Sequence, residues 1–510
     1  MRDSSGLLRR RVHPADGRTI WEFMAEETAL GEPLDAWPLR VLRDKNLGRM
    51  VIADRDLAAG ELVFEEEPFV QTIHDRCEST NCHHCYAPVT KEGTTRRAIS
   101  CPECQGQVTY CSEACARGGL EQHSAECGVL GALASSGNTG LLRGLRGLRL
   151  FIRLVHKAAN DPATFAQKIE RMTEHYDEAT AQRRQWLETM ADQINRFVPP
   201  EVRMERVRLA KLVDRVHTNL YAVQNQAGLQ FGSALYPDAG SLFNHSCAPT
   251  AVVSFRGRMW RLHTLRKVSR GEEITVSYIE LYASRDERQA AVLAKKGFTC
   301  ACTRCATPLP TDAVLDGWRC PNGARCRGQG AVAPSASGCT QCGVAHALDS
   351  RERAARERPW RESIGACNNK LMRFDSATAT EAAARSAAKA MQDILAETDG
   401  LLCEHHVIRH TARKLRVYAL SSLPTTTKAS EMVEALEGAI GGMAVHLPTS
   451  HPELAFFRHR LAQVLASLPG RAKQAAMAAT SAADALEVAY GADHPTAGEW
   501  RATANKMSRK

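Results

Sequence analysis

Eight residues that can bind zinc are clustered in one short stretch of the sequence. They are Cys82, Cys85, Cys101, Cys104, Cys111, Cys115, His123 and Cys127. Zinc prefers thiolate and imidazole ligands, and structural zinc sites hold the ion tetrahedrally through four of them. Paired cysteines at this close spacing are more typical of metal sites than of unrelated buried thiols. The stretch therefore predicts two closed zinc sites that keep a segment with little hydrophobic core folded.

Two further cysteine clusters follow toward the C-terminus. The first supplies only three thiols, so a tetrahedral site there needs a fourth ligand from elsewhere in the fold; they are Cys300, Cys302 and Cys305. The second supplies four thiols among glycines, prolines and serines, which is typical of a zinc ribbon; they are Cys320, Cys326, Cys339 and Cys342. His346 is a competing ligand there, as Cys77, His83 and His84 are in the first stretch.

Two short polar motifs lie between the cysteine clusters. Residues 244–249 read Asn-His-Ser-Cys-Ala-Pro, and residues 271–278 read Gly-Glu-Glu-Ile-Thr-Val-Ser-Tyr. Each has an ordinary structural interpretation: Asn244 as a turn former, His245 as a hydrogen-bonded core histidine, and Tyr278 as strand packing. Their combination, followed by Cys-x-Cys-x2-Cys, favours a functional site.

These motifs resemble the SET domain of protein lysine methyltransferases, and the eight-ligand stretch resembles a MYND zinc finger. A SET domain split by a MYND finger is the arrangement of the SET and MYND domain (SMYD) family, and the resemblance covers roughly residues 38–305. It implies interleaved zinc ligation, with one ion on Cys82, Cys85, Cys111 and Cys115 and another on Cys101, Cys104, His123 and Cys127. It also implies that Cys247 is the fourth ligand of the three-thiol cluster.

The resemblance implies S-adenosylmethionine as the cofactor. The residues implied to bind it are Leu47, Gly48, Arg49, His175, Asn244, His245, Tyr278 and Phe298. Tyr278 matches the catalytic tyrosine, and Tyr221 matches a wall of the lysine channel. The sequence departs from the family pattern at Met50, which replaces a loop glycine, and near Lys296, where many relatives have a channel aromatic. If position 50 needs a positive φ, Met50 strains the loop.

The reaction implied is direct in-line transfer of a methyl group to a neutral lysine amine. Such a reaction depends mainly on positioning, and a desolvated channel near the cationic sulfonium lowers the pKa of the lysine. Histone tails or other proteins are the expected substrates, and the MYND finger and C-terminal helices are expected to bind peptide partners. Two alternatives remain: a catalytically weak or inactive SET-fold adaptor, and a zinc-rich nucleic-acid binder supported only by mild basicity and an arginine stripe over 143–153.

The elements that position these residues follow from hydrophobic periodicity. Strand-like runs lie between Val41 and Ile73, and helical periodicity extends over 141–220, where we expect the arginine stripe to be a solvated face. Residues 251–255 and 259–263 form a hairpin candidate, and residues 274–278 another strand. Ser284 and Glu287 form a capping box that begins a helix ending at Gly297.

The predicted fold class is α+β, a SET-type β-fold split by a MYND finger and a helical insert. The Ala- and Leu-rich C-terminal region repeats His405-His406, His451-Pro452 and His494-Pro495 beside amphipathic helices, which resembles TPR-type hairpins; a plain helical bundle is the alternative. The predicted domains are an N-terminal extension without clear pattern (1–36), the first SET part (37–76), the MYND finger (77–130), a helical SET insert (131–215), the SET core (216–283), a post-SET segment (284–308), a zinc ribbon-like segment (309–348) and a TPR-like domain (349–510).

Length and composition limit the classes of protein to which this sequence can belong. The chain has 510 residues, 44% hydrophobic and 24% charged, which excludes fibrous and wholly disordered classes. The net charge of +9 is small for this length, so we do not expect nucleic-acid binding. The charged start lacks the apolar region of a secretory signal, and no run is long enough to span a membrane. We therefore expect a monomer of the cytoplasm and nucleus, with reduced, zinc-binding cysteines.

Overall fold

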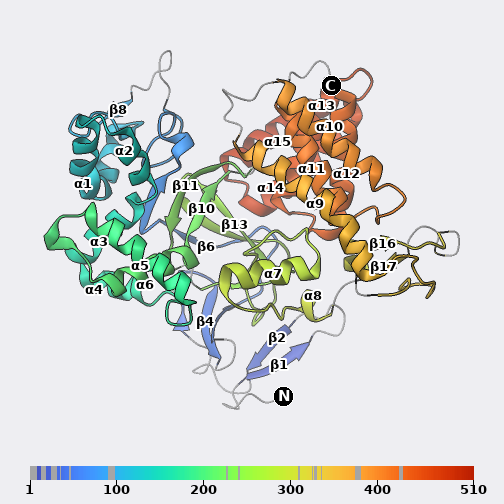
Figure 1. Ribbon diagram of the computed structural model, residues 1–510, viewed down its shortest axis with the longest axis horizontal. Helices are drawn as coiled ribbons and strands as arrows, with labels where there is room; N and C mark the ends of the chain where they lie inside the picture. The colour runs from blue at the N-terminus through green and yellow to red at the C-terminus, as the bar shows by residue number, and fades with distance from the viewer. Residues whose placement is uncertain are drawn as a thin grey trace.

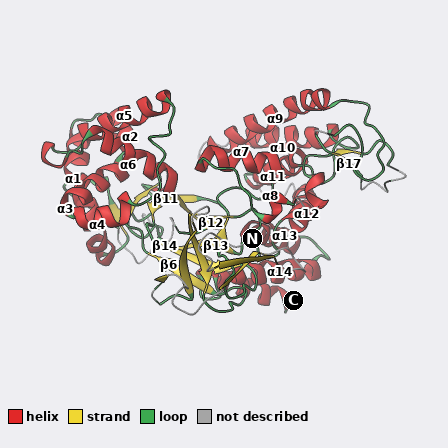
Figure 2. Cartoon of the chain, turned by 90° about the horizontal axis from the view of Figure 1, so that it is seen from below, coloured by secondary structure: helices red, strands yellow, loops and turns green. Residues whose placement is uncertain are grey.

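Two helical lobes stand on either side of a group of short strands (Figures 1 and 2). The computed structural model describes residues 8–12, 19–23, 32–34, 36–44, 48–89, 98–225, 228–238, 242–307, 310–323, 326, 330–334, 336–373, 381–423 and 429–509. Leu47, a predicted cofactor contact, lies outside the described residues. No helix in these ranges combines the length and hydrophobicity that crossing a membrane requires.

The strands between the lobes form three three-stranded antiparallel sheets. The first contains β3 (Glu32–Pro33), β4 (Leu39–Asp44) and β5 (Gly48–Ala53). The second contains β6 (Leu62–Glu66), β14 (Met259–Thr264) and β13 (Ala251–Arg256). The third contains β7 (Val70–Ile73), β11 (Gln230–Leu235) and β10 (Tyr221–Gln224). Strands from before and after the helical insert therefore share one core, which confirms the predicted split β-fold.

One parallel pair joins the two polar motifs. Strand β12 (Asn244–His245) lies beside β15 (Thr275–Val276), with Asn244 opposite Thr275 and His245 opposite Val276. The hairpin predicted over 251–263 is confirmed. The strand predicted over 274–278 is confirmed only at its centre, so Tyr278 follows the strand and is not part of it.

The first helical lobe carries the zinc-rich stretch and the insert. It contains the 3-10 helix η2 (Asp75–Cys77), β8 (Ile99–Ser100), β9 (Thr109–Tyr110) and α1 (Glu113–Ser135). The insert contains α2 (Thr139–Arg146), α3 (Arg149–Asn160), α4 (Pro162–Phe165), the π-helix η3 (Ala166–Glu170), α5 (Ala181–Arg196), the 3-10 helix η4 (Pro200–Val202) and α6 (Arg206–Asn219). The predicted helical region is confirmed as several short helices, the first break falling at Gly147.

Helix α7 (Arg285–Lys296) leads from the strands toward the C-terminal lobe. Its predicted capping box is present, since the Ser284 hydroxyl accepts from the Glu287 amide and the Glu287 carboxylate accepts from the Ser284 amide. It ends at Gly297 with a φ of 73°, the left-handed conformation that favours glycine. Next come α8 (Thr303–Ala306), the 3-10 helix η5 (Pro310–Val314), β16 (Trp318–Arg319) and β17 (Ala331–Val332).

The second lobe is a stack of consecutive helices, as expected of a TPR-like region. The helices are α9 (Ser350–Arg373), α10 (Glu381–Glu397), α11 (Val407–Ser421), α12 (Ala429–His446), α13 (Pro452–Ala466), α14 (Ala472–Tyr490) and α15 (Pro495–Ser508). The histidine repeat marks helix starts, because Nδ1 of His406, His451 and His494 accepts the backbone N–H two residues on. Each imidazole thus satisfies a donor that a helix leaves unpaired.

The N-terminal residues differ from the prediction. Residues 1–36 were expected to be an extension without pattern, but β1 (Leu8–Val12) pairs antiparallel with β2 (Thr19–Phe23), and β3 joins the first sheet. Strands of two to five residues are too short to show a clear period-2 pattern, so pairing with a neighbour identifies them better than sequence does.

Candidate active site and metal centres

Tyr278 lies beside a large cavity, two residues after the end of β15. Its hydroxyl donates to the Phe243 carbonyl at 2.6 Å, and its backbone N–H donates to Nδ1 of His245 at 3.1 Å. Burial, with a smaller contribution from Glu273, raises the pKa of Tyr278 to about 12. The phenol therefore stays protonated at neutral pH. It can orient a reactant as a dipole, but it is not poised to act as a base.

The Asn244 side chain connects three segments that are far apart in the sequence through hydrogen bonds. Its side-chain amide donates to the Arg49 carbonyl at 2.8 Å and to the Glu273 carboxylate at 2.9 Å. Because β12 and β15 lie in parallel register, the first motif is held against the second. The structure thus brings Arg49, Asn244, His245 and Tyr278 close together, although they are far apart in the sequence.

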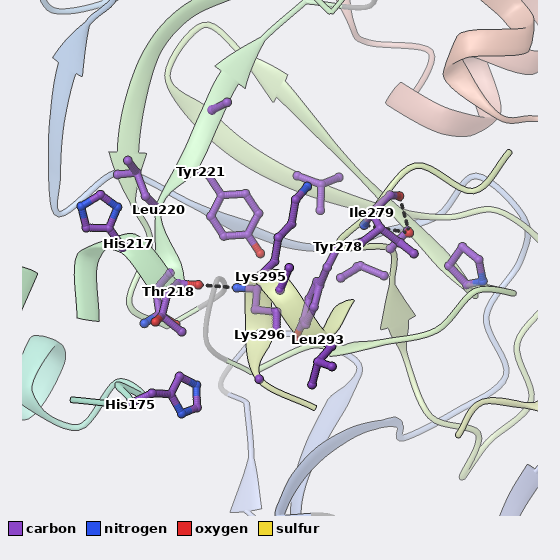
Figure 3. Close-up of a pocket in the computed structure, with 18 of the residues that line it drawn as sticks. His175, His217, Thr218, Leu220, Tyr221, Tyr278, Ile279, Leu293, Lys295 and Lys296 are labelled. Carbon is purple, nitrogen blue, oxygen red and sulfur yellow. Dashed lines mark hydrogen bonds between the residues drawn. The ribbon is translucent and has the colours of Figure 1, made fainter. Parts of the chain in front are cut away.

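The cavity beside Tyr278 has a volume of about 1430 Å³. Typical small-molecule sites occupy about 300–1,000 Å³, so this one has room for a cofactor and an acceptor side chain. Of the predicted site residues, His175, Tyr221 and Tyr278 line it (Figure 3). Arg49, Asn244, His245 and Phe298 are not part of its lining.

Tyr221 and His175 enter the cavity from different elements. Tyr221 begins β10 and packs edge-to-face on Trp260 at 6.0 Å between ring centroids, and burial raises its pKa. His175 follows the π-helix η3, and a Cβ placed on Gly297 would lie 3.8 Å from its ring. His175 is thereby next to the chain at Phe298, whose side chain is 40% exposed, so a flat ligand could cover that ring.

Met50 is not strained, contrary to the concern raised by the missing glycine. It lies in β5 opposite Leu42, is fully buried, and packs with Leu42 and Ile52. Its φ is not among the positive values that the described residues show. An extended strand accepts any side chain, so methionine here adds core packing at no backbone cost.

The structure gathers the sixteen predicted metal ligands into four groups. The groups are Cys82, Cys85, Cys111 and Cys115; Cys101, Cys104, His123 and Cys127; Cys247, Cys300, Cys302 and Cys305; and Cys320, Cys326, Cys339 and Cys342, with the ligand atoms of each group within 4.8 Å of one another. Zn–S bonds of about 2.3 Å place tetrahedral sulfurs about 3.8 Å apart. The separations of 3.6 Å for Cys85–Cys111, 3.7 Å for Cys101–Cys127 and 3.6 Å for Cys247–Cys305 fit this geometry.

The competing ligands lie outside the four groups. Nδ1 of His83 is 3.1 Å from the Thr109 backbone, and Nδ1 of His346 is 3.0 Å from the Leu348 amide that donates to it. Cys77 packs in the strand core, where its thiol contacts the Gln230 carbonyl. Four soft ligands per group leave no open coordination position, so each group could hold one structural zinc ion.

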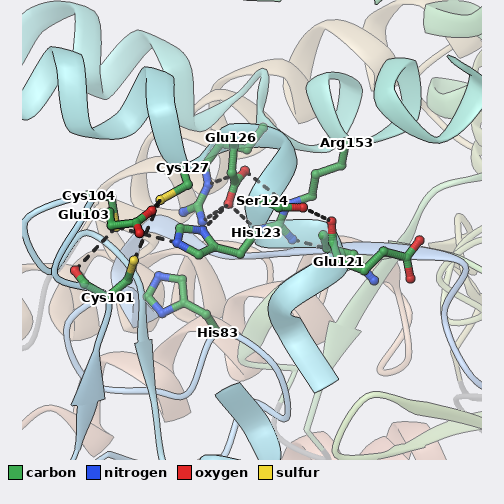
Figure 4. Close-up of polar contacts among 12 residues, drawn as sticks. His83, Cys101, Glu103, Cys104, Glu121, His123, Ser124, Glu126, Cys127 and Arg153 are labelled. Atoms are coloured by element: carbon green, nitrogen blue, oxygen red, sulfur yellow. Dashed lines mark hydrogen bonds and ion pairs between the residues drawn. The ribbon is translucent and has the colours of Figure 1, made fainter. Parts of the chain in front are cut away.

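Second-layer contacts surround two of the groups. His245 accepts the Tyr278 amide at Nδ1, so its proton is on Nε2, which faces the Cys247 sulfur at 3.3 Å. Tyr278 is therefore linked through His245 to a metal group. His123 places Nδ1 at 3.8 Å from the Glu126 carboxylate (Figure 4). Such partners fix the orientation of metal ligands.

The arginine stripe is not the solvated face that the sequence predicted. Arg149 and Arg153 are buried, and both donate to the carboxylate of Glu126, which is also fully buried. Arg143 is exposed and Arg146 is half-exposed, so only this part of the stripe is solvated as predicted. A carboxylate on α1, near its zinc ligand, attracts the two cations inward, and sequence periodicity cannot show this.

Comparison with known proteins agrees with this geometry. The model of the SET domain matches residues 48–279. N-lysine methyltransferase SMYD2-A of Xenopus laevis is 26% identical over 53% of this chain and 61% of its own length. The match and this relative support the predicted resemblance to the SET and MYND domain (SMYD) family. Another SMYD-family relative, SMYD2 of Gallus gallus, is 26% identical over 51% of this chain and 57% of its own length.

Two further similarities extend beyond the animal members of the SMYD family. Histone-lysine N-methyltransferase ASHR1 of Arabidopsis thaliana is 26% identical over 54% of this chain and 57% of its own length. The chain therefore spans less than two thirds of each of these relatives. A solved structure of TPR-like repeats from Podosopora anserina shares 15% identity, covering 30% of this chain and 66% of its own; its TM-score of 0.23 is too low to define a common architecture.

Proposed function

We propose that this protein is an S-adenosylmethionine-dependent protein-lysine N-methyltransferase. The supporting observation is the position of Tyr278, a buried and protonated phenol at the edge of a large cavity, held by Phe243 and His245. When bound, the cofactor supplies a methyl group already activated on a sulfonium. The protein then has to align an amine with that group and exclude water, and both tasks are positional.

Different residues of this chain are proposed to hold the cofactor and to position the acceptor amine. Asn244, Arg49, His175 and Phe298 are proposed to hold the cofactor, together with Leu47, Gly48 and His245. Tyr278 and Tyr221 are proposed to form the walls around the acceptor amine, with the Tyr278 hydroxyl orienting it. Aromatic walls displace water from the amine, which lowers its pKa and favours the neutral form that attacks.

Histones and other proteins are the proposed substrates. Support comes from the names of the relatives, one of which is a histone-lysine N-methyltransferase. The proposed roles of the zinc-rich lobe and the TPR-like helices are peptide binding and formation of the groove around the cavity. Zinc is proposed in all four cysteine groups, where it would hold the loops and not take part in the reaction.

A labelling assay tests the proposal. The purified chain is incubated with methyl-labelled cofactor and a mixture of histones and cell proteins, and cofactor binding is measured by calorimetry. Tyr278→Phe is expected to bind cofactor but transfer label about 10²- to 10³-fold more slowly, as loss of one orienting hydrogen-bonding group does elsewhere. Asn244→Ala is expected to lose cofactor affinity. An unlabelled mixture together with absent cofactor binding would overturn the proposal.

A further inference from the structure

A lysine of the chain itself lies in the cavity proposed for substrate lysine. Lys296 is the last residue of α7, and its half-buried side chain lies in the cavity lining beside Tyr278 and Thr218 (Figure 3). Its ammonium donates to the Thr218 carbonyl and lies 4.7 Å from the centroid of the Tyr278 ring. An aromatic face and a backbone carbonyl therefore replace most of its water.

The cavity also changes the chemistry of this amine. Burial, with a smaller contribution from the neighbouring Lys295, lowers the pKa of Lys296 to about 8. With that pKa about a quarter of the amine is neutral at pH 7.5, against about one in a thousand for an ordinary lysine. Lys295, the preceding residue, also lines the cavity, but its side chain is more exposed to solvent. Desolvation at the cavity thus produces the form of the amine that a methyl transfer needs.

We propose that Lys296 is a methyl acceptor within its own chain, modified by the active site into which it projects. This inference rests on the proposed function. The neutral Nζ attacks the methyl carbon of the sulfonium cofactor, an N–C bond forms, and the C–S bond breaks with its electron pair left on sulfur. The nitrogen loses its proton to solvent before the attack, and the products are N-methyllysine and the thioether form of the cofactor.

Position in the same chain favours Lys296 over any lysine from outside. Groups held in one molecule meet at effective concentrations far above those of a diffusing protein. The lysine of another protein has to displace Lys296 from the Tyr278 face before it reaches the same place. Self-methylation is therefore expected to precede methylation of other proteins, with no dependence on protein concentration.

The decisive experiment uses the full chain with a deuterated-methyl cofactor and no other substrate, followed by peptide mass spectrometry. We expect the label on Lys296 at a first-order rate that stays constant over a ten-fold dilution. Lys296→Arg and Lys296→Met are expected to lose this label while still binding cofactor. Lys267→Arg changes an exposed lysine outside the cavity lining and is the control that keeps the label. Label on Lys295 in place of Lys296 would overturn the assignment. Tyr278→Phe is expected to slow it about 10²- to 10³-fold.

The possible failures can be told apart. Label on added histones but not on Lys296 overturns the inference and leaves the proposed function in place. Label on Lys296 whose rate rises with protein concentration overturns the intramolecular route. If no protein is labelled and no cofactor binds, both the proposed function and this inference are wrong.

A second measurement needs no cofactor. Trace acetylation with isotopic acetic anhydride between pH 6 and 11 reports the ionisation of each lysine, with the exposed Lys267, outside the cavity lining, as the internal reference. Lys296 is expected to reach half of its maximal reactivity near pH 8. Half-maximal reactivity near pH 10.5 would overturn the premise that the cavity keeps this amine partly neutral.

Discussion

The zinc-rich stretch and the C-terminal helices are both small packed units, but different interactions hold them together. Among the described residues between Cys82 and Cys127 the elements are one pair of two-residue strands and one long helix, and metal ligands make up much of the small buried interior. The C-terminal helices instead bury two clusters rich in Ala and Leu side chains, the larger of which also packs against the last two cysteine groups. One region depends on four-fold coordination of a metal, and the other depends on area removed from water.

Metal removal should produce the largest difference in stability between the two regions. Structural zinc contributes about 10–16 kcal/mol to the folding of isolated finger peptides, so a chelator should unfold the zinc-rich stretch while the C-terminal helices persist. Elemental analysis should find four zinc ions per chain before treatment. Limited proteolysis with mass spectrometry should then show cleavage within 82–127 first. Equal protection of both regions after complete zinc loss would contradict this comparison.

The buried carboxylate of Glu126 should give the next largest effect. Glu126→Gln leaves Arg153 without its counter-charge in the core and Arg149 with Glu78 alone, and breaking a buried pair costs about 3–5 kcal/mol. Denaturant unfolding monitored on the first lobe measures the loss. The control is Glu113→Gln on the same helix, where the ion pair with Arg117 is exposed and a change within about 0.5 kcal/mol is expected. Similar losses in both variants would show that the pair is not effectively buried.

In the C-terminal lobe, truncation of a core side chain should lower the free energy of unfolding without changing zinc binding. Leu486 is fully buried in α14, so Leu486→Ala is expected to cost about 2–5 kcal/mol. Zinc content should stay unchanged. Met477 lies on the same helix at 65% exposure, and Met477→Ala is the matched control with little expected effect. Zinc loss in Leu486→Ala would indicate that the two lobes fold as one unit.

The smallest expected effect is at a helix start. His494→Ala removes the acceptor for the Thr496 amide and the contact with the Phe255 carbonyl, and is expected to cost about 1 kcal/mol in thermal unfolding. His494→Asn keeps a capping acceptor and should recover part of this loss. If Asn is no better than Ala, the histidine acts mainly through its contact with the strand hairpin.

Much of the fold followed from local chemistry. The capping box at Ser284, the left-handed stop at Gly297 and the hairpin over 251–263 depend on residues within a few positions of one another, so the sequence shows them directly. The sixteen soft ligands were equally visible, because metal sites require particular residue types. The β1–β2 hairpin and the buried state of Arg149 and Arg153 were not, since both depend on partners elsewhere in the chain.

Ligand types, helix limits and the alternation of strands and helices were decided by the sequence alone, because each reflects interactions over short distances. Only the tertiary structure decided that Asn244 ties Arg49 to Glu273, that Met50 lies unstrained in a strand, and that Lys296 enters the cavity beside Tyr278. These outcomes depend on which segments share a core and which amines lose their water, and no spacing along the chain records either.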